Sequence, residues 1–351
     1  MEQTDQTARR GPGLGTARRR AVDTTSLVET SVLPGTEGLP LVIKPTMGTV
    51  DLAEWTASNR EQIDTYLDKH GAILFRGFGI KGAEDFEAVA SAIVPDLFAE
   101  YGDLPPESTS ERVYHSTPYP ADKMILFHNE SSHLPSWPMR QFFYCVVPSQ
   151  KGGTTPLLDG RRVYEALDPD LRDQFEQKGL TYIRNFLPGL DVPWQDFFKT
   201  DDREEVERSC AEAGMSCEWT ANDGLRITQT GPAVITHPNT GEKIWFNQIQ
   251  LHHVACLDPE TRASLEQLVS EEEMPRNVRF GDGTKIPDET VEAIGEMYER
   301  LCVEFPWDAG DMIVVDNMIV QHARRPFEGE RKILVAMGKM VHASELEEAA
   351  V

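Results

Sequence analysis

The chain has 351 residues, of which 40% are hydrophobic and 26% are charged, and its 58 acidic against 34 basic residues give a formal net charge of −24. This acidic balance argues against nucleic acid and against an anionic membrane surface as partners, since both need a basic surface. No apolar run approaches the roughly 18 residues of a membrane span, and no secretory signal follows the N-terminal arginines. The five cysteines show no CxxC spacing, which argues against a disulfide framework and favours a reducing, cytoplasmic location.

Residues 1–36 predict a flexible N-terminal tail, because they are rich in Thr, Gly and Arg and lack apolar periodicity. Residues 37–345 are expected to form a single domain. A helix is predicted to begin after Asp51, with Glu54 three residues later in the pattern of a capping box, and to end near Gly71. Apolar periodicity predicts further helices near residues 84–97, 161–179, 201–214, 259–271 and 287–302.

Short apolar runs between turns predict the strands. They lie at residues 72–75, 124–127, 141–147, 233–237, 244–248, 312–315 and 332–337. Helices and strands do not alternate in a regular βαβ rhythm, and neither GxGxxG nor a P-loop is present. We therefore expect an antiparallel sheet core with helices packed outside it.

The first candidate for chemistry is His128-Asn129-Glu130, at the end of the strand predicted over residues 124–127. Side chains at i and i+2 of a strand share a face, so His128 and Glu130 could bind one metal ion. An H-x-E pattern is weak by itself, because a chain with nine His and this many acids contains such a pair by chance. Read alone, it is a capping or surface His beside a Glu.

The C-terminal region strengthens that candidate. Residues 311–321 are apolar and strand-like and lead to His322, and residues 326–330 then form a turn before Arg331. A hairpin here would return Arg331 to the side of His322. Two His and one carboxylate form the facial triad of non-heme iron oxygenases, which leaves three positions for a 2-oxo acid and dioxygen. Arg331, with the hydroxyl of Thr155 after a Gly-Gly pair, suits the far carboxylate of such an acid.

The chain resembles the TauD/TfdA superfamily of Fe(II)/2-oxoglutarate dioxygenases, and within it the branch of the syringomycin aspartate hydroxylase. The resemblance covers residues 39–340. It rests on HGAILFRGF (70–78), STPYPADKMILFHNESSHLPSWP (116–138), KGGTTPLLD (151–159), YIRNF (182–186), HPNTGEKIWFNQ (237–248) and FPWDAGDMIVVDNMIVQHARRPFEGERKILVAM (305–337).

The resemblance implies a mainly β fold, the double-stranded β-helix or cupin-like jelly roll, with helical insertions and an insert or lid within about residues 185–300. It implies Fe(II) bound by His128, Glu130 and His322, with 2-oxoglutarate as cosubstrate and O2 as oxidant. Thr155 and Arg331 would hold the distal carboxylate of 2-oxoglutarate. The usual superfamily ligand is Asp, whereas Glu130 matches the clavaminate synthase-like branch. A halogenase would need Gly or Ala there, so Glu130 favours hydroxylation.

The implied substrate is an amino acid or an amino-acid-derived metabolite of antibiotic biosynthesis, free or tethered to a carrier protein. The residues predicted to contact it are Asn247, Arg184, His133, Ser132 and Arg325. Three of them have a plainer interpretation: Asn247 could bond a nearby turn, Arg184 could pair with a surface acid, and one of Arg324 and Arg325 is expected to be a solvated charge. The oligomeric state is not indicated by the sequence.

Other functions remain open at this point. The same cofactors could support desaturation, epoxidation or cyclisation. A zinc hydrolase could use His128, Glu130 and His322 with a bound water, but Arg331 and Thr155 would then have no role. A jelly-roll binding protein could also keep the metal site for structure alone.

Overall fold

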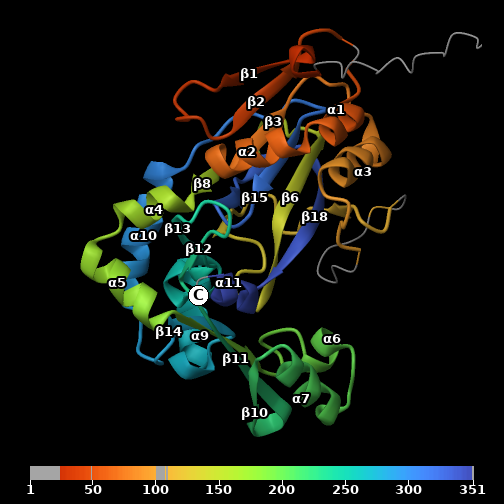
Figure 1. Cartoon of the computed structure of the whole chain (residues 1–351). Coiled ribbons are helices and arrows are strands. Elements are labelled where there is room, and N and C mark those ends of the chain that lie inside the picture. Colours follow the sequence, from red (N-terminus) through yellow and green to blue (C-terminus); the bar gives the residue numbers. More distant parts are fainter. Residues whose placement is uncertain (1–23, 49, 100–106, 108–109, 350–351) are drawn as a thin grey trace, which may run out of the picture.

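The computed structural model describes residues 24–48, 50–99, 107 and 110–349, and the first part of the predicted tail, residues 1–23, lies outside the described residues. Two sheets face each other. The larger sheet contains, in spatial order, β1 (Val28–Val32), β2 (Leu41–Pro45), β3 (Ala72–Phe75), β15 (Met312–Asp316), β6 (Ser136–Val147), β18 (Lys332–His342) and β4 (Tyr114–His115). The smaller sheet contains β5 (Ile125–His128), β16 (Val320–Arg324) and β8 (Leu157–Asp159). All pairs are antiparallel except β2 with β3, and the expected jelly roll is confirmed (Figure 1).

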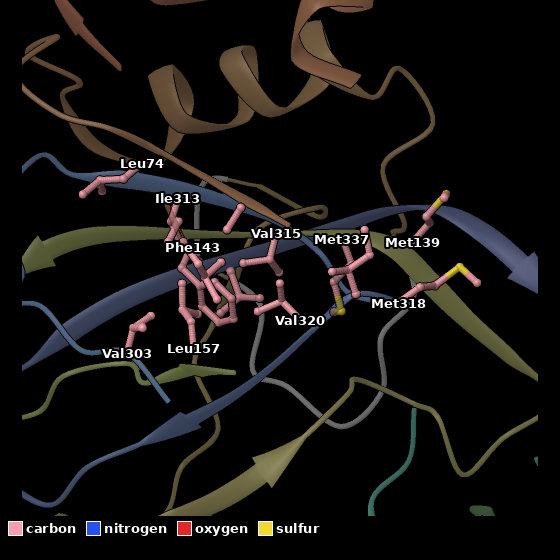
Figure 2. Close-up of a cluster of buried hydrophobic side chains, with 14 of the residues drawn as sticks. Leu74, Met139, Phe143, Leu157, Val303, Ile313, Val315, Met318, Val320 and Met337 are labelled. Carbon is pink, nitrogen blue, oxygen red and sulfur yellow. The ribbon is translucent and has the colours of Figure 1, made fainter. Parts of the chain in front are cut away.

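Strand β15 shows why the larger sheet forms. Its alternate residues Ile313 and Val315 enter the cluster between the two sheets, whereas Met312 and Val314 face the N-terminal helices. A strand buried on both faces requires a continuous apolar run, which is the pattern at residues 312–315. Figure 2 shows this cluster, in which side chains of β15, β6 and β18 meet side chains of β8 and β16 from the facing sheet.

The N-terminal helices cover the outer face of the larger sheet (Figure 1). They are α1 (Leu52–Ser58), α2 (Arg60–His70) and α3 (Gly82–Ile93). The Asp51 carboxylate accepts a hydrogen bond of 3.0 Å from the Glu54 amide, so the predicted start is confirmed. The single helix expected up to Gly71 is interrupted at Asn59, whose φ and ψ of −126° and 28° are not helical. Gly71 ends α2 in the left-handed region, with φ of 73°.

The folded region begins earlier than the expected boundary at residue 37. Strand β1 pairs along its whole length with β2, from Val28 opposite Pro45 to Val32 opposite Leu41. Thr36 is also buried. The sequence signal was weak here because an edge strand with one exposed face, read as VETSV, needs little apolar character.

The middle of the chain adds a third layer. A four-stranded sheet has the order β10 (Ser216–Thr220), β11 (Gly224–Gly231), β9 (Leu180–Phe186) and β14 (Arg276–Phe280). Around it lie α4 (Gly160–Ala166), α5 (Pro169–Lys178), α6 (Trp194–Phe198), α7 (Arg203–Glu212), α8 (Ile249–His252), α9 (Pro259–Leu268) and α10 (Asp288–Leu301). Helices α6 and α7 with β10 project from the lower end in Figure 1 and have their own small core. The insert or lid within about residues 185–300 stays a prediction, and that range contains β10, β11, β14 and helices α6 to α10 of this layer.

Two short pairings and a terminal helix complete the described fold. Strand β12 (Val234–Thr236) pairs with β13 (Lys243–Trp245), and β7 (Lys151–Gly152) pairs with β17 (Phe327–Glu328). Helix α11 (Ala343–Ala349) follows β18. Among the described residues, no helix is long and apolar enough to cross a membrane.

The predicted hairpin between His322 and Arg331 is wrong. The apolar stretch over residues 311–321 is broken after β15 by a turn, where the Asp316 carboxylate accepts hydrogen bonds from the amides of Met318 and Ile319. Strand β16 thereby crosses to the smaller sheet, whereas β18 belongs to the larger one. His322 and Arg331 therefore approach each other from two facing sheets and not along one ladder.

Candidate metal centre

His128 and Glu130 stand at the end of β5, in a backbone that other residues hold in place. The Glu130 amide donates to Asn317 Oδ1 at 2.6 Å, and Asn317 Nδ2 donates back to the Glu130 carbonyl at 3.0 Å. His128 Nδ1 lies 2.7 Å from the Leu126 carbonyl oxygen, so this nitrogen carries the proton. The lone pair of His128 is then on Nε2, the arrangement expected of a metal-binding imidazole.

His322 completes the group from the neighbouring strand. It lies directly opposite His128 in the pairing of β16 with β5, and the two ring centroids are 4.3 Å apart. One ligand atom from each of His128, Glu130 and His322 lies within 4.8 Å of the others. Because the register places both imidazoles on one face, the backbone itself brings the three side chains together.

The donor set fits a divalent metal ion. Burial holds the pKa of His322 well below its ordinary value, with His128 adding to the effect, so the ring is neutral and can donate a lone pair. Its Nδ1 is buried and has no hydrogen-bond partner among the residues that the structure describes. Gln141 Nε2 donates to Glu130 Oε2 at 3.2 Å and orients the carboxylate. Two neutral imidazoles and one carboxylate leave further coordination positions free.

A partly buried cation lies in the same pocket. Arg331 Nε donates to the Gly153 carbonyl at 2.9 Å, and its Nη2 lies 3.4 Å from Thr155 Oγ1. Trp307 Nε1 donates to the same hydroxyl at 3.1 Å. Burial, and then Arg324, lower the pKa of Arg331 to about 10, which leaves it charged at neutral pH. No acidic side chain of the described residues forms an ion pair with Arg331, so a small anion can satisfy it.

The pocket joins the three candidate ligands to this cation. It is lined by Ser116, Thr117, Ile125, His128, Glu130, Gln141, Phe143, Thr155, His322, Ala323, Arg324, Arg331, Ile333 and Val335. The lining residues come from both facing sheets. One end therefore offers metal ligands and the other a hydroxyl and a guanidinium, which suits a molecule that chelates a metal and carries a distant carboxylate.

Comparison with known proteins agrees with this arrangement. The profile of the "Taurine catabolism dioxygenase TauD, TfdA family" matches residues 34–337. The chain belongs to the TauD/TfdA dioxygenase family. Enzymes of this family depend on iron and 2-oxoglutarate, and the site described above has the donors for both.

Two curated relatives span almost the same length. The chain is 36% identical over 315 residues to the dapdiamide synthesis protein DdaC of Enterobacter agglomerans, covering 90% of this chain and 96% of that protein. It is 30% identical over 321 residues to a clavaminate synthase-like protein of Arabidopsis thaliana, covering 86% and 93%.

Solved structures share the fold at low identity. PvcB from Pseudomonas aeruginosa has a TM-score of 0.53 at 14% identity, covering 93% of this chain and 95% of that one. A taurine dioxygenase from Burkholderia xenovorans has a TM-score of 0.53 at 15% identity, covering 93% and 99%. The jelly roll is thus shared with enzymes whose sequences have diverged widely.

Three predicted substrate residues of the dioxygenase lie outside the pocket. Arg325 forms ion pairs of 2.6 Å with both Glu299 and Glu304, and its neighbour Arg324 lines the pocket instead. Asn247 is fully buried; its Nδ2 donates to the Ala233 carbonyl and its Oδ1 accepts from the Ile249 amide. Ser132 is buried and donates to the Asn129 carbonyl at 3.0 Å. These are the contacts of structural side chains.

His133 lies against the four-stranded sheet, and neither His133 nor Arg184 lines the pocket. The His133 ring is 5.9 Å from that of Tyr182, which shares a face of β9 with Arg184. Burial, and then Arg276, lower the pKa of His133 to about 4. His133 is therefore neutral at physiological pH.

Several residues that shape the pocket were not predicted. Asn317 holds the backbone of Glu130, Gln141 orients its carboxylate, and Trp307 contacts Thr155. A signal for Gln141 existed, because Arg140 and Gln141 are two polar residues in an otherwise apolar strand between Trp137 and Val147. Asn317 gave none, since its role depends on a turn between two sheets.

A second group of metal-binding residue types lies elsewhere. Asp68, His237 and Asp316 also place ligand atoms within 4.8 Å of one another. Here, however, the guanidinium of buried Arg140 forms an ion pair with Asp316, and His237 Nε2 donates to the same carboxylate at 3.1 Å. The chain's own cation thus occupies the place that a metal ion would take.

Proposed function

We propose that this dioxygenase hydroxylates an unactivated C–H bond of an amino acid or an amino-acid-derived metabolite, free or tethered to a carrier protein. His128, Glu130 and His322 would hold Fe(II), and Thr155 with Arg331 would hold the distal carboxylate of 2-oxoglutarate. The proposal is supported above all by the pocket, whose lining includes His128, Glu130 and His322 together with Thr155 and Arg331, and no ion pair of Arg331 with an acidic side chain is found among the described residues.

Fe(II), 2-oxoglutarate and O2, when bound, supply the oxidation, in which one oxygen atom enters the substrate and the other leaves in succinate with release of CO2. The protein supplies binding and orientation. Gln141 fixes the Glu130 carboxylate, and the Leu126 carbonyl fixes the tautomer of His128. Phe143, whose ring centroid is 5.0 Å from that of His322, forms an apolar wall that keeps water from the site.

Hydroxylation is favoured over halogenation by the third ligand. The Glu130 carboxylate is aimed at the two imidazoles and takes the position that a halide would need. Desaturation, epoxidation and cyclisation use the same cofactors and the same residues, and only the product separates them from hydroxylation. A zinc hydrolase would leave Arg331 and Thr155 without a function.

The substrate class draws support from one relative. The protein that is 36% identical over nine-tenths of this chain is named for dapdiamide synthesis, which favours a role in the biosynthesis of a secondary metabolite. Fold alone carries no substrate, so the proposal rests on that relative and on the polar groups beside the pocket.

Succinate formation tests the proposed function. The purified chain would be incubated aerobically with Fe(II), 2-oxoglutarate and a library of amino acids and their derivatives, with mass spectrometry of the products. We expect succinate in the presence of both Fe(II) and 2-oxoglutarate, and a product heavier by one oxygen atom. Omitting 2-oxoglutarate or replacing Fe(II) by Zn²⁺ should abolish it. Product formation with Zn²⁺ and no 2-oxoglutarate would instead establish a hydrolase.

A further inference from the structure

A second guanidinium lines the metal pocket and forms no ion pair with an acid among the described residues. Arg324 follows His322 by two positions on β16, and only 7% of it is exposed to solvent. Its terminal nitrogens donate instead to three backbone carbonyls, those of Tyr119 at 3.0 Å, Pro120 at 2.5 Å and Lys123 at 2.7 Å. This buried cation is therefore bonded to one stretch of main chain.

That stretch, residues 116–123, connects the two facing sheets. It leaves β4, the last strand of the larger sheet, and leads into β5, an outer strand of the smaller sheet. It contains neither helix nor strand, so no backbone ladder fixes its position. Ser116 and Thr117 at its start line the pocket. Residues 116–123 therefore form a wall of the pocket that joins the edges of the two sheets.

This wall lies at the end of the pocket that contains Arg331. The Ser116 amide donates at 3.1 Å to the carbonyl of Ile333, two residues after Arg331. The Phe327 amide donates to a carbonyl of the wall at 2.8 Å. The Phe327 ring also contacts both guanidinium groups, with its centroid 5.2 Å from that of Arg324 and 5.6 Å from that of Arg331. The wall, this ring and the candidate anchor for 2-oxoglutarate are therefore in contact.

We propose that Arg324 is a positioning residue, which fixes residues 116–123 as the wall around the 2-oxoglutarate end of the pocket. The inference rests on the proposed function and adds a determinant of cosubstrate binding that acts through the wall. It assigns the effect to the fork of the guanidinium, which reaches three carbonyls at once, and not to its charge. Without the fork those carbonyls lose a shared donor, the wall opens more often, and 2-oxoglutarate is held less tightly.

Cleavage by trypsin measures the wall without any ligand. Lys123 lies in the wall with a half-exposed side chain, so cleavage after it reports how often the wall opens. We expect this bond, followed by mass spectrometry, to be cut about tenfold faster in Arg324→Gln and in Arg324→Lys than in the wild type. Arg325→Gln alters the neighbouring arginine, which pairs with Glu299 and Glu304 outside the pocket, and its rate should stay within about twofold. Equal cleavage of all four proteins, each folded by circular dichroism, would overturn the proposal.

Binding of 2-oxoglutarate separates the fork from the charge. Calorimetry would titrate 2-oxoglutarate into protein loaded with Zn²⁺, so that no turnover occurs. We expect the dissociation constant to rise about tenfold in both Arg324→Gln and Arg324→Lys, because lysine keeps the charge beside Arg331 but cannot reach three carbonyls at once. Arg325→Gln should bind as the wild type does. Full recovery of the affinity by lysine would show that only the charge matters, and it would overturn the assignment.

The positioning role and the proposed function can fail separately. Wild-type protein that binds no 2-oxoglutarate and forms no succinate would refute the proposed function, and faster cleavage of the Arg324 variants would still show that Arg324 holds the wall. Equally tight binding by the wild type and both Arg324 variants would refute the positioning role alone. In turnover with Fe(II), a loosened wall should raise the KM for 2-oxoglutarate and leave kcat at saturation within about twofold. A fall in kcat at unchanged KM would overturn the positioning role.

Discussion

Two buried clusters of this protein contain the same kinds of side chain and differ in what neutralises them. The metal cluster, His128, Glu130 and His322, borders an open pocket. The Asp316 cluster, with His237 and Asp68, is closed by Arg140, which is itself fully buried. Both satisfy the same ligand-to-ligand distance. Proximity of metal-binding residue types therefore does not by itself define a metal site. The two clusters differ in whether a cation of the protein itself is paired with the ligand atoms.

The surroundings of the two clusters support this distinction. Asp316 accepts two backbone amides of the turn between β15 and β16 in addition to Arg140 and His237, so its oxygens are occupied. Glu130 has Gln141 on one oxygen, and His322 Nδ1 has no partner among the described residues. The Asp316 cluster shapes the turn that carries β16 to the smaller sheet, and the metal cluster uses the position so created.

The largest expected effect separates the clusters by function. His128→Ala and His322→Ala should each lower succinate formation by more than about a thousandfold, because a triad with one ligand missing binds iron weakly and orients it poorly. Iron content after gel filtration and the rate of succinate release would be measured together. His342→Ala, at the exposed last position of β18, is the control and should keep both. Iron content that is unchanged in both ligand variants would contradict the assignment.

The second prediction tests the Asp316 cluster by stability. Asp316→Asn leaves the buried Arg140 charge without its main partner and should lower the free energy of unfolding by about 3–5 kcal/mol. Denaturant unfolding of the apo protein measures it. Asp308→Asn removes an exposed acid paired with Arg76 and should cost no more than about 1 kcal/mol. A loss of iron from folded Asp316→Asn protein, at unchanged stability, would reverse the roles of the two clusters.

The sequence predicted the metal cluster and could not predict the Asp316 cluster. The spacing of His128 and Glu130 put them on one face of a strand end, and the C-terminal segment with the family motifs then added His322 and singled the group out. Arg140, His237 and Asp316 come from three distant segments that meet only after the sheets have packed. No local pattern distinguishes such an acid from a surface one.

The errors have the same origin. The sequence located the strands at residues 312–315 and 332–337, but the hairpin between β16 and β18 failed because a turn at Asn317 sends β16 to the other sheet. Likewise, Arg325 and Arg324 are adjacent, and the strand's two faces decide which one reaches the pocket. Side-chain direction at the end of a strand depends on register, which the sequence alone leaves open.

The third prediction concerns Arg331, the guanidinium that lines the same pocket as the metal cluster. Arg331→Gln should raise the KM for 2-oxoglutarate by about 10–100-fold, because a charge-assisted pair with its distal carboxylate contributes about 1.5–3 kcal/mol. Steady-state succinate formation at saturating Fe(II) measures it. Arg325→Gln is the matched control, since its ion pairs with Glu299 and Glu304 lie outside the pocket, and its KM should stay within about twofold. An unchanged KM in Arg331→Gln would show that the carboxylate binds elsewhere.

The smallest expected effect distinguishes the surroundings of the metal cluster from the Asp316 cluster by the pH dependence of stability. His133, beside the metal cluster, has its pKa lowered by burial and by Arg276 to about 4, from an unfolded value near 6.5. The unfolded state binds the proton first, so the stability contributed by neutral His133 is present above pH 6.5 and is lost as the pH falls toward 4. The expected loss is about 2–3 kcal/mol, at 1.36 kcal/mol per pKa unit. Urea unfolding between pH 7 and 4 should show a flatter profile for His133→Gln.

Asp316 affects the stability of the protein at lower pH than His133 does. Burial alone would raise its pKa, but Arg140 and then His237 outweigh burial and lower it. Its stabilising charge is therefore present above the unfolded pKa of about 3.9 and disappears only as the pH falls below that value. Asp316→Asn should remove the loss of stability below about pH 4 and keep the loss between pH 6.5 and 4. His133→Gln should have the reverse effect. If His133→Gln instead flattened the pH dependence of the free energy of unfolding below pH 4, the two regions would not titrate independently. The lowered pKa of His133 would then be caused by the Asp316 cluster and not by burial beside the pocket.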